Sequence, residues 1–228
     1  MNTEEENNLN EEVMSTTQSA FRAAFGLALF AVLTAGLIAF AKLGTNERII
    51  EQEEKARLAA LYALVPESYR NNDLLKDSYL LTSPNATEPR TVFVAKNDGQ
   101  ASALVLPWTA PDGYTAPIQL LIAIKTSGEL LGVRVVEHKE TPGLGDKIDV
   151  SKSDWVLSFD GRSLENTTAT QWQVKKDGGD FDQLTGATIT PRAVVSSVYE
   201  ALNFFEENKV ALLNQSAQSS LDLAQAGQ

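Results

Sequence analysis

The sequence predicts an α+β protein in which a single N-terminal transmembrane helix is followed by an antiparallel-sheet domain with flanking helices. Three observations predict this fold. One apolar stretch near the N-terminus has no charged residue over 19 positions. Strand-like runs then occur in pairs, and within each pair a short turn sequence joins the two runs. A run with helical periodicity follows near the C-terminus, and this order is typical of α+β folds.

The apolar stretch at 23–41 lies between Arg22 and Lys42. At about 1.5 Å per residue, a helix of this length spans roughly 28 Å, close to the hydrocarbon thickness of a bilayer. Residues 1–22 are acidic and poor in apolar residues, and we expect a mobile tail there. This tail has no basic residue before Arg22, whereas a cleaved signal peptide begins with basic residues. We therefore expect an uncleaved anchor.

The charges around the anchor do not fix its orientation. One basic residue precedes it, and Lys42, Arg48, Lys55 and Arg57 follow it. A literal positive-inside rule would keep the large domain in the cytoplasm. Glutamates are interleaved with these basic residues, however, and long domains can cross a membrane despite flanking charge. Either side of the membrane remains open at this point.

Residues 42–74 are interpreted as a juxtamembrane helix and a connection. Apolar residues recur at helical spacing up to Leu64, and the Val65-Pro66 pair should end the helix, because a residue before proline disfavours the α conformation. Residues 70–90 are rich in Asn, Asp, Ser and Pro and predict an irregular segment.

A folded domain is predicted over 75–206. Strands at 91–96 and 101–108 flank Asn97-Asp98-Gly99-Gln100, and strands at 118–125 and 129–138 flank Thr126-Ser127-Gly128. Their many Val, Ile and Leu residues indicate a largely buried sheet, and Trp108, Trp155, Trp172 and His138 are expected to be structural residues.

A helix is predicted from Pro191, with Thr190 as its N-cap. Residues 207–228 are rich in Gln, Ser and Ala, and a frayed tail is expected after Asn208.

The composition narrows the possible functions. The 228 residues include 30 acidic and 19 basic side chains, for a net charge of −11. Recognition of nucleic-acid phosphates needs a basic face, so we expect no nucleic-acid partner. The chain has one histidine and no cysteine. This composition excludes disulfides, iron–sulfur clusters and cysteine- or histidine-rich metal sites, and it predicts no Ser-His-Asp triad.

Two Gly- and Thr-rich loops are candidates for chemistry. The first contains Glu140, Thr141, Gly143, Leu144 and Gly145, and it is either a ligand loop or an ordinary tight turn. The second runs through Thr185, Gly186, Ala187 and Thr188 into the predicted helix at Thr190. A helix N-terminus stabilises a phosphate without any basic patch. The alternative interpretation of this second loop is a plain helix cap.

The segment from Asp182 to Thr188 resembles the flavinylation motif of proteins that carry covalent FMN. The wider stretches 110–124, 136–148, 153–159 and 174–194 resemble the G subunit of the Rnf/Rsx-type ion-translocating electron transport complex. The resemblance covers most of residues 45–205.

This resemblance implies an FMN-binding domain whose FMN is joined through its phosphate to Thr188. It also implies a flavin transferase that installs FMN from FAD, other membrane and peripheral subunits as partners, and a place in the bacterial inner membrane with the flavin domain in the periplasm. The chain would then be an electron carrier within the complex, with no catalysis of its own.

Further contacts to the flavin are expected around Thr188. Thr185, Gly186, Ala187 and Thr190 belong to the same turn. We expect Leu144 to contact the ring or ribityl chain, Gly143 and Gly145 to permit close approach, and Glu140 and Thr141 to make polar contacts. Lys175 and Lys176 either assist the phosphate or are solvated surface charges.

Three other functions remain open. The FMN-bearing C subunit of the sodium-translocating NADH:quinone reductase is similar in fold and motif. The chain could instead be a membrane-tethered binding module without a redox cofactor, or a structural tether whose helix holds partner subunits together.

Overall fold

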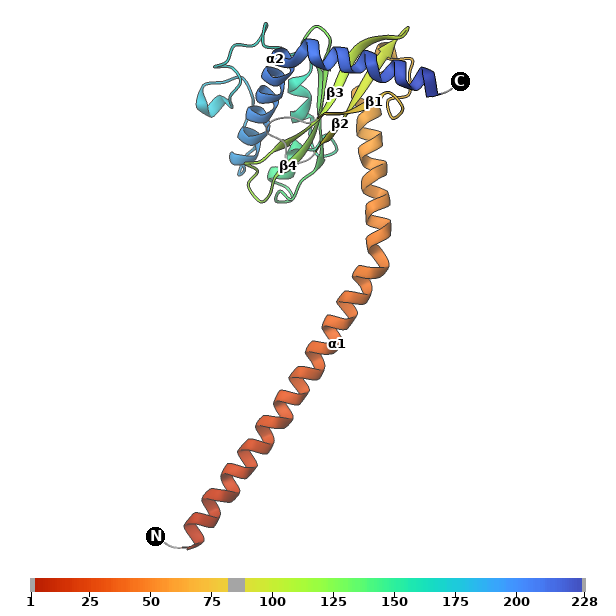
Figure 1. The fold of residues 1–228 in the computed structure, drawn as a ribbon. Coiled ribbons are helices and arrows are strands. Elements are labelled where there is room, and N and C mark those ends of the chain that lie inside the picture. The colour runs from red at the N-terminus through yellow and green to blue at the C-terminus, as the bar shows by residue number, and fades with distance from the viewer. Residues whose placement is uncertain (1–2, 82–88, 227–228) are drawn as a thin grey trace. The chain divides into compact units, whose positions relative to one another are not determined.

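The computed structural model describes residues 3–81 and 89–226, with side chains from residue 20 to residue 217 except at 43–44, 46–47, 49–50, 53 and 82–88. The chain divides into two compact units, Met1–Lys55 and Ala56–Gln228. The second unit holds the sheet and the candidate site (Figure 1).

Helix α1 (Thr3–Leu64) is continuous through the expected tail, the anchor and the juxtamembrane helix. The segment 1–22, which was expected to be a mobile tail, is helical from residue 3 onward. No proline or glycine occurs before Gly26. Once the apolar segment has nucleated a helix, each further residue adds a hydrogen bond at little cost, so the helix extends outward.

The middle of α1 carries the membrane segment. Ala20–Lys42 is the one helical stretch among the described residues that is long and apolar enough to cross a membrane. Its large side chains are exposed on every side of the helix; Phe25, Phe30 and Phe40 are examples. A helix that is apolar all round belongs in lipid or in a protein core, and none of this segment is buried in protein.

Helix α1 ends at Leu64, as the following Val65-Pro66 pair predicts. Arg70 closes this end: its Nε donates to the Val65 carbonyl at 3.0 Å, and its guanidinium lies 4.7 Å from the centre of the Tyr62 ring. A short 3₁₀ turn, η1 (Glu67–Tyr69), leads toward the sheet.

Five antiparallel strands form one sheet in chain order: β1 (Ser78–Leu81), β2 (Arg90–Asn97), β3 (Gln100–Ala110), β4 (Ile118–Lys125) and β5 (Leu130–Glu137). Both predicted hairpins are confirmed. The first turns through Asp98 and Gly99, which have φ of 51° and 78°. Positive φ at both turn residues matches the right-handed twist of the strands.

Strand β1 lies inside the segment that was predicted to be irregular. Its four residues pair with β2 from Ser78 opposite Phe93 to Leu81 opposite Arg90. Four residues are too few to show a clear alternation of apolar and polar side chains. The extended conformation of this segment therefore depends on its pairing with β2. The prediction for 70–90 is corrected at this strand.

Both faces of the sheet are buried, as the Val-, Ile- and Leu-rich strands predict. One face packs against α2 (Ile189–Ala226), which lies across the sheet in Figure 1. The opposite face contacts Leu61, Leu64 and Val65 at and just beyond the end of α1. The larger core includes Leu104, Leu106, Leu120, Ile122, Ile124, Val194, Val198 and Phe205.

Helix α2 continues about 20 residues beyond the predicted boundary at 206. The expectation of a frayed tail is therefore wrong up to Ala226. Leu212 is buried, and the Tyr79 hydroxyl donates to its carbonyl at 3.0 Å. Burial raises the pKa of this tyrosine. No helix breaker follows Pro191 until Gly227. The extension is therefore anchored on β1 by packing and by a hydrogen bond.

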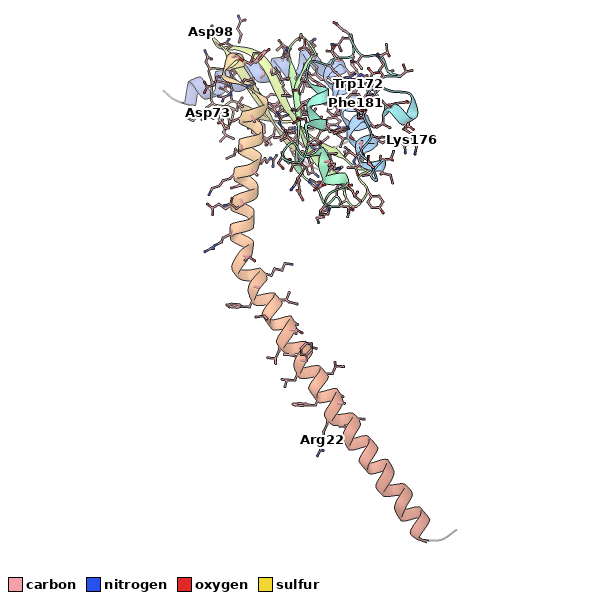
Figure 2. All side chains as sticks on the ribbon, turned by 180° about the vertical axis from the view of Figure 1, so that it is seen from behind. Arg22, Asp73, Asp98, Trp172, Lys176 and Phe181 are labelled. Carbon is pink, nitrogen blue, oxygen red and sulfur yellow. The ribbon has the colours of Figure 1, made fainter. Side chains whose placement is uncertain are left out.

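Three 3₁₀ turns, η2 (Gly145–Ile148), η3 (Asp154–Phe159) and η4 (Lys175–Asp177), lie between β5 and α2. An aromatic cluster supports them. The Phe159 and Phe181 ring centres are 4.7 Å apart, and those of Trp172 and Phe181 are 5.4 Å apart. Figure 2 labels Trp172 and Phe181. Trp155 and Trp172 are buried, as predicted for core residues, and Trp108 is half-buried against Phe204.

Candidate functional site

Three segments that are distant in sequence meet at one cavity of about 190 Å³. They are the loop between β3 and β4, the loop after β5, and the turn that leads into α2. The cavity is lined by Tyr114, Glu140, Thr141, Leu144, Gly145, Gly186, Ala187, Thr188, Ile189 and Thr190. Eight of the ten site residues expected from the sequence are among them; Gly143 and Thr185 are not.

The loop after β5 folds around one carbonyl group. The Thr141 carbonyl accepts the N–H groups of Leu144 and Gly145, both at 3.1 Å. Gly143 has φ of 78° and no protein atom close to where a Cβ would lie, so the turn itself favours a glycine at this position. Leu144 remains 40% exposed at the cavity.

Glu140 connects the three segments. Its side chain is buried, and its Oε1 accepts the backbone N–H of Thr115 at 3.0 Å. Its Oε2 accepts the Thr190 hydroxyl in a short hydrogen bond. A Cβ on Gly145 would lie 2.9 Å from Glu140 Oε2 and 3.0 Å from Thr190 Oγ1. Gly145 therefore allows the Glu140 and Thr190 side chains to approach the loop backbone closely.

The turn before α2 is equally tight. The Ala187 N–H donates to the Leu184 carbonyl at 3.0 Å, and Gly186 has φ of 81°. A Cβ on Gly186 would lie 3.0 Å from Leu144 Cδ2. The two candidate loops thus contact each other through Leu144 and Gly186.

The three threonines of this turn are in different environments. Thr185 is exposed and does not line the cavity, whereas Thr190 is fully buried and its hydroxyl is bonded to Glu140. Thr188 lines the cavity and is half-buried. Its hydroxyl makes no hydrogen bond to any residue that the structure describes. Of these three threonines, Thr188 is thus the one that lines the cavity and has a hydroxyl without a hydrogen bond to the described residues.

Helix α2 begins at Ile189, so Thr190 is not the N-cap that was predicted. Its hydroxyl faces Glu140 instead. The first N–H groups of a helix have no intrahelical acceptor and give this end a partial positive charge, which favours an anion. None of the described residues that line the cavity is basic.

Ion pairs hold the segment in front of α2. Arg192 binds Asp177 through two hydrogen bonds, from Nε to Oδ2 at 2.5 Å and from Nη2 to Oδ1 at 2.7 Å. This hydrogen-bonded pair lowers the pKa of Asp177 and raises the pKa of Arg192. The Trp155 indole N–H also donates to the Asp182 carbonyl at 2.6 Å.

Lys175 and Lys176 do not line the cavity. Lys175 Nζ instead lies 2.6 Å from Asp182 Oδ1, and Lys176 is exposed (Figure 2). His138 is half-buried at the end of β5, where its Nδ1 accepts the Glu140 N–H at 3.1 Å, as expected for a structural residue.

Sequence reasoning missed two residues of the cavity. Tyr114 is 66% exposed and Ile189 is 47% exposed. The signal for Tyr114 was an aromatic residue between two loop-forming elements, Asp112-Gly113 and Pro117. Gly113 is required there, because a Cβ would lie 2.1 Å from the Ala116 carbonyl oxygen.

The cavity combines an available hydroxyl, a helix N-terminus and an apolar rim of Tyr114, Leu144 and Ile189. A phosphate fits beside the first N–H groups of α2, and a flat apolar group fits the rim. These residues therefore suit a ligand with a phosphate at one end and a ring system at the other.

Comparison with known proteins identifies relatives for both parts of the chain. Residues 14–64 match the RnfG N-terminal region, and residues 113–203 match the FMN-binding domain family. The chain is similar to the G subunit of the ion-translocating oxidoreductase complex of Pseudomonas aeruginosa strain UCBPP-PA14, with 48% identity over 202 residues, 87% of this chain and 94% of that protein.

Proteins with the same description occur in other bacteria. The chain is 45% identical to the one from Pseudoalteromonas atlantica over 204 residues, 88% of this chain and 95% of that protein. It is 42% identical to the one from Vibrio atlanticus over 191 residues, 83% of this chain and 91% of that protein.

Proposed function

Since the chain belongs to the family of G subunits of the ion-translocating oxidoreductase complex, we propose that its cavity holds FMN as a covalently attached electron carrier. The chain is a membrane-anchored flavoprotein of an ion-translocating electron transport complex. We further propose that FMN is joined through its phosphate to Thr188. The observation that carries this assignment is the half-buried Thr188 hydroxyl, which lies in the cavity without a hydrogen-bond partner among the described residues.

The residues around Thr188 have separate tasks in this proposal. The N-terminal N–H groups of α2 stabilise the phosphate, and no basic side chain is required for that. Tyr114, Leu144 and Ile189 offer apolar contacts to the ring, while Glu140 and Thr141 are polar groups of the wall. Bound FMN supplies the electron-accepting ring, and the protein supplies its position and electrostatic surroundings.

The size of the cavity supports a carrier role. Pockets that enclose a whole ligand of drug size measure roughly 300–1,000 Å³, whereas this cavity measures about 190 Å³. Only part of FMN fits inside, so the remainder faces outward, where redox partners can approach it. A covalent tether keeps such a weakly enclosed ligand in place.

Attachment needs a second protein. We propose a flavin transferase that uses FAD: the Thr188 Oγ–P bond forms, the pyrophosphate bond of FAD breaks, and AMP and a proton leave. The described residues that line the cavity include one carboxylate, Glu140, and it is already bonded to Thr115 and Thr190. Those contacts leave no evident base of this chain's own for the step.

We propose the bacterial inner membrane as the location, with the flavin domain in the periplasm and the other subunits of the complex as partners. This orientation follows the family resemblance and runs against the literal charge rule. The match of residues 14–64 to the RnfG N-terminal region favours the G subunit over the C subunit of the sodium-translocating NADH:quinone reductase.

Intact-mass measurement of the full chain, produced together with its flavin transferase, tests the attachment. We expect an increase equal to FMN less one water, and we expect Thr188→Ala to lose it. Thr185→Ala is the matched control, because Thr185 lies outside the cavity, and it should keep the full increase. Peptide mapping must locate the flavin on residue 188. Unmodified wild-type protein contradicts the redox function, and flavin on residue 190 contradicts the residue assignment.

A further inference from the structure

We propose that Glu140 lowers the reduction potential of the flavin by placing a fixed negative charge in the wall of the cavity. This inference rests on the proposed function, because it requires FMN in the cavity. Glu140 is the one charged side chain among the described residues that line it. Its carboxylate is therefore the one formal charge that these lining residues can place beside a bound ligand.

The groups that hold the Glu140 carboxylate are neutral. Oε1 accepts a backbone N–H from Thr115 at 3.0 Å, and Oε2 accepts the hydroxyl of Thr190. An ionised carboxylate can only accept hydrogen bonds, and a backbone N–H and a hydroxyl are both suitable donors to it. Neither donor carries a formal charge, so the negative charge is oriented but not neutralised.

Among the described residues, no hydrogen bond or ion pair joins the Glu140 carboxylate to a Lys or Arg side chain. Lys175 is paired with Asp182, and Arg192 is paired with Asp177. Nδ1 of His138 accepts the Glu140 backbone N–H at 3.1 Å, so this contact places no donor of His138 on the carboxylate. The N-terminus of α2 offers a partial positive charge, which stabilises a buried carboxylate without adding a full cation.

Burial makes this charge effective. Charges interact more strongly away from water, where the effective dielectric constant is lower. The Glu140 side chain is only 4% exposed. A flavin tethered at Thr188 would enter the cavity that Glu140 also lines, so the carboxylate would act on it across this small cavity and not through bulk water. Gaining electrons adds negative charge to the flavin, and a nearby carboxylate opposes that gain.

Hydrogen bonding alone does not require a charge at this position. A glutamine would accept the Thr115 N–H through its carbonyl oxygen and could donate to Thr190 Oγ1 through its amide. Glu140→Gln therefore keeps the shape of the wall and removes its charge. This makes the variant a selective probe of the electrostatic role.

The test is a spectroelectrochemical titration of the flavin in the full chain, after intact mass has shown that FMN is attached. We expect Glu140→Gln to shift the midpoint potential to a more positive value. Glu207→Gln is the matched control, because it makes the same charge change at an exposed residue. Glu207 lies eighteen residues after Ile189 in α2, which is about 27 Å along the helix. It should leave the potential unchanged.

Thr190→Val separates charge from hydrogen bonding. This variant removes the hydroxyl but retains the carboxylate, so the potential should stay at the wild-type value or fall. A rise in both Glu140→Gln and Thr190→Val would overturn the proposal, as would an unchanged potential in flavin-loaded Glu140→Gln. If Glu140→Gln does not take up FMN, Thr190→Val decides alone, and a rise there counts against the proposal. Absence of FMN from the wild type is a failure of the proposed function itself.

Discussion

Within six residues, the turn before α2 and the start of the helix place three threonine hydroxyls in three environments. The Thr185 side chain is exposed, the Thr190 hydroxyl is bonded to a buried carboxylate, and the Thr188 hydroxyl lines the cavity without such a bond. Chemically equivalent side chains therefore differ in accessibility. At the residue scale, this difference is the reason that we propose Thr188 as the attachment point.

Gly145 and Gly143 provide a matched pair for testing how closely this site is packed. A methyl group on Gly145 would meet Glu140 and Thr190, and we expect Gly145→Ala to lower the unfolding free energy by about 1–3 kcal/mol and to reduce FMN incorporation. Gly143 has open space but a positive φ, so Gly143→Ala should cost about 1–2 kcal/mol and preserve incorporation. Urea unfolding and intact mass measure the two effects. Full stability and full incorporation in Gly145→Ala would contradict the close packing.

At the scale of elements, α2 has two roles. Its N-terminus forms one wall of the cavity, while its length spans the sheet as far as β1. The contact between Tyr79 and Leu212 ties the distal part of α2 to the edge strand. The part of α2 beyond residue 206 is thus structural support for the sheet that carries the site.

Two neighbouring positions in α2 test whether this distal part is packed. Leu212 is buried and Val210 is 74% exposed. We expect Leu212→Ala to reduce the unfolding free energy by about 2–5 kcal/mol, whereas Val210→Ala should change it by less than about 0.5 kcal/mol. Chemical denaturation of both variants provides the comparison. Equal, negligible effects would indicate that the segment is frayed, as the sequence first predicted.

The whole molecule combines an anchor with a domain that has its own core. The division between units falls at Lys55 and Ala56, inside the continuous helix α1. Residues after this point contribute Leu61 and Leu64 to the second face of the sheet. The end of α1 is therefore part of the folded domain, and the membrane segment is separate from it.

Two fragments with different starting points test this division. A fragment that begins at Ala56 should fold, stay in solution without detergent and accept FMN from the transferase, because it keeps the whole core. A fragment that begins at Pro66 lacks Leu61, Leu64 and Val65. Loss of even one buried leucine costs about 2–5 kcal/mol, so this fragment should unfold at lower denaturant concentration. Equal midpoints would show that the end of α1 does not contribute to the core.

The sequence by itself determined the features that depend on local residue patterns. The length of the stretch without charged residues predicted the membrane-spanning helix. Paired strand-like runs, with Asp98-Gly99 and Ser127-Gly128 between them, predicted the hairpins. The Val65-Pro66 pair predicted where α1 ends. Motif spacing directed attention to Thr188. Such features need only neighbours in sequence, because turn geometry and helix breaking are local.

The tertiary structure decided what depends on distant partners. Glu140 and Thr190 are 50 residues apart, yet their hydrogen bond determines which threonine is available. Tyr114 joins the cavity because Glu140 binds the adjacent Thr115 N–H, and β1 forms because β2 supplies its partners. The local pattern of apolar and polar residues contains no information about packing or buried hydrogen bonds between segments that are distant in sequence. These contacts are therefore known only from the folded chain.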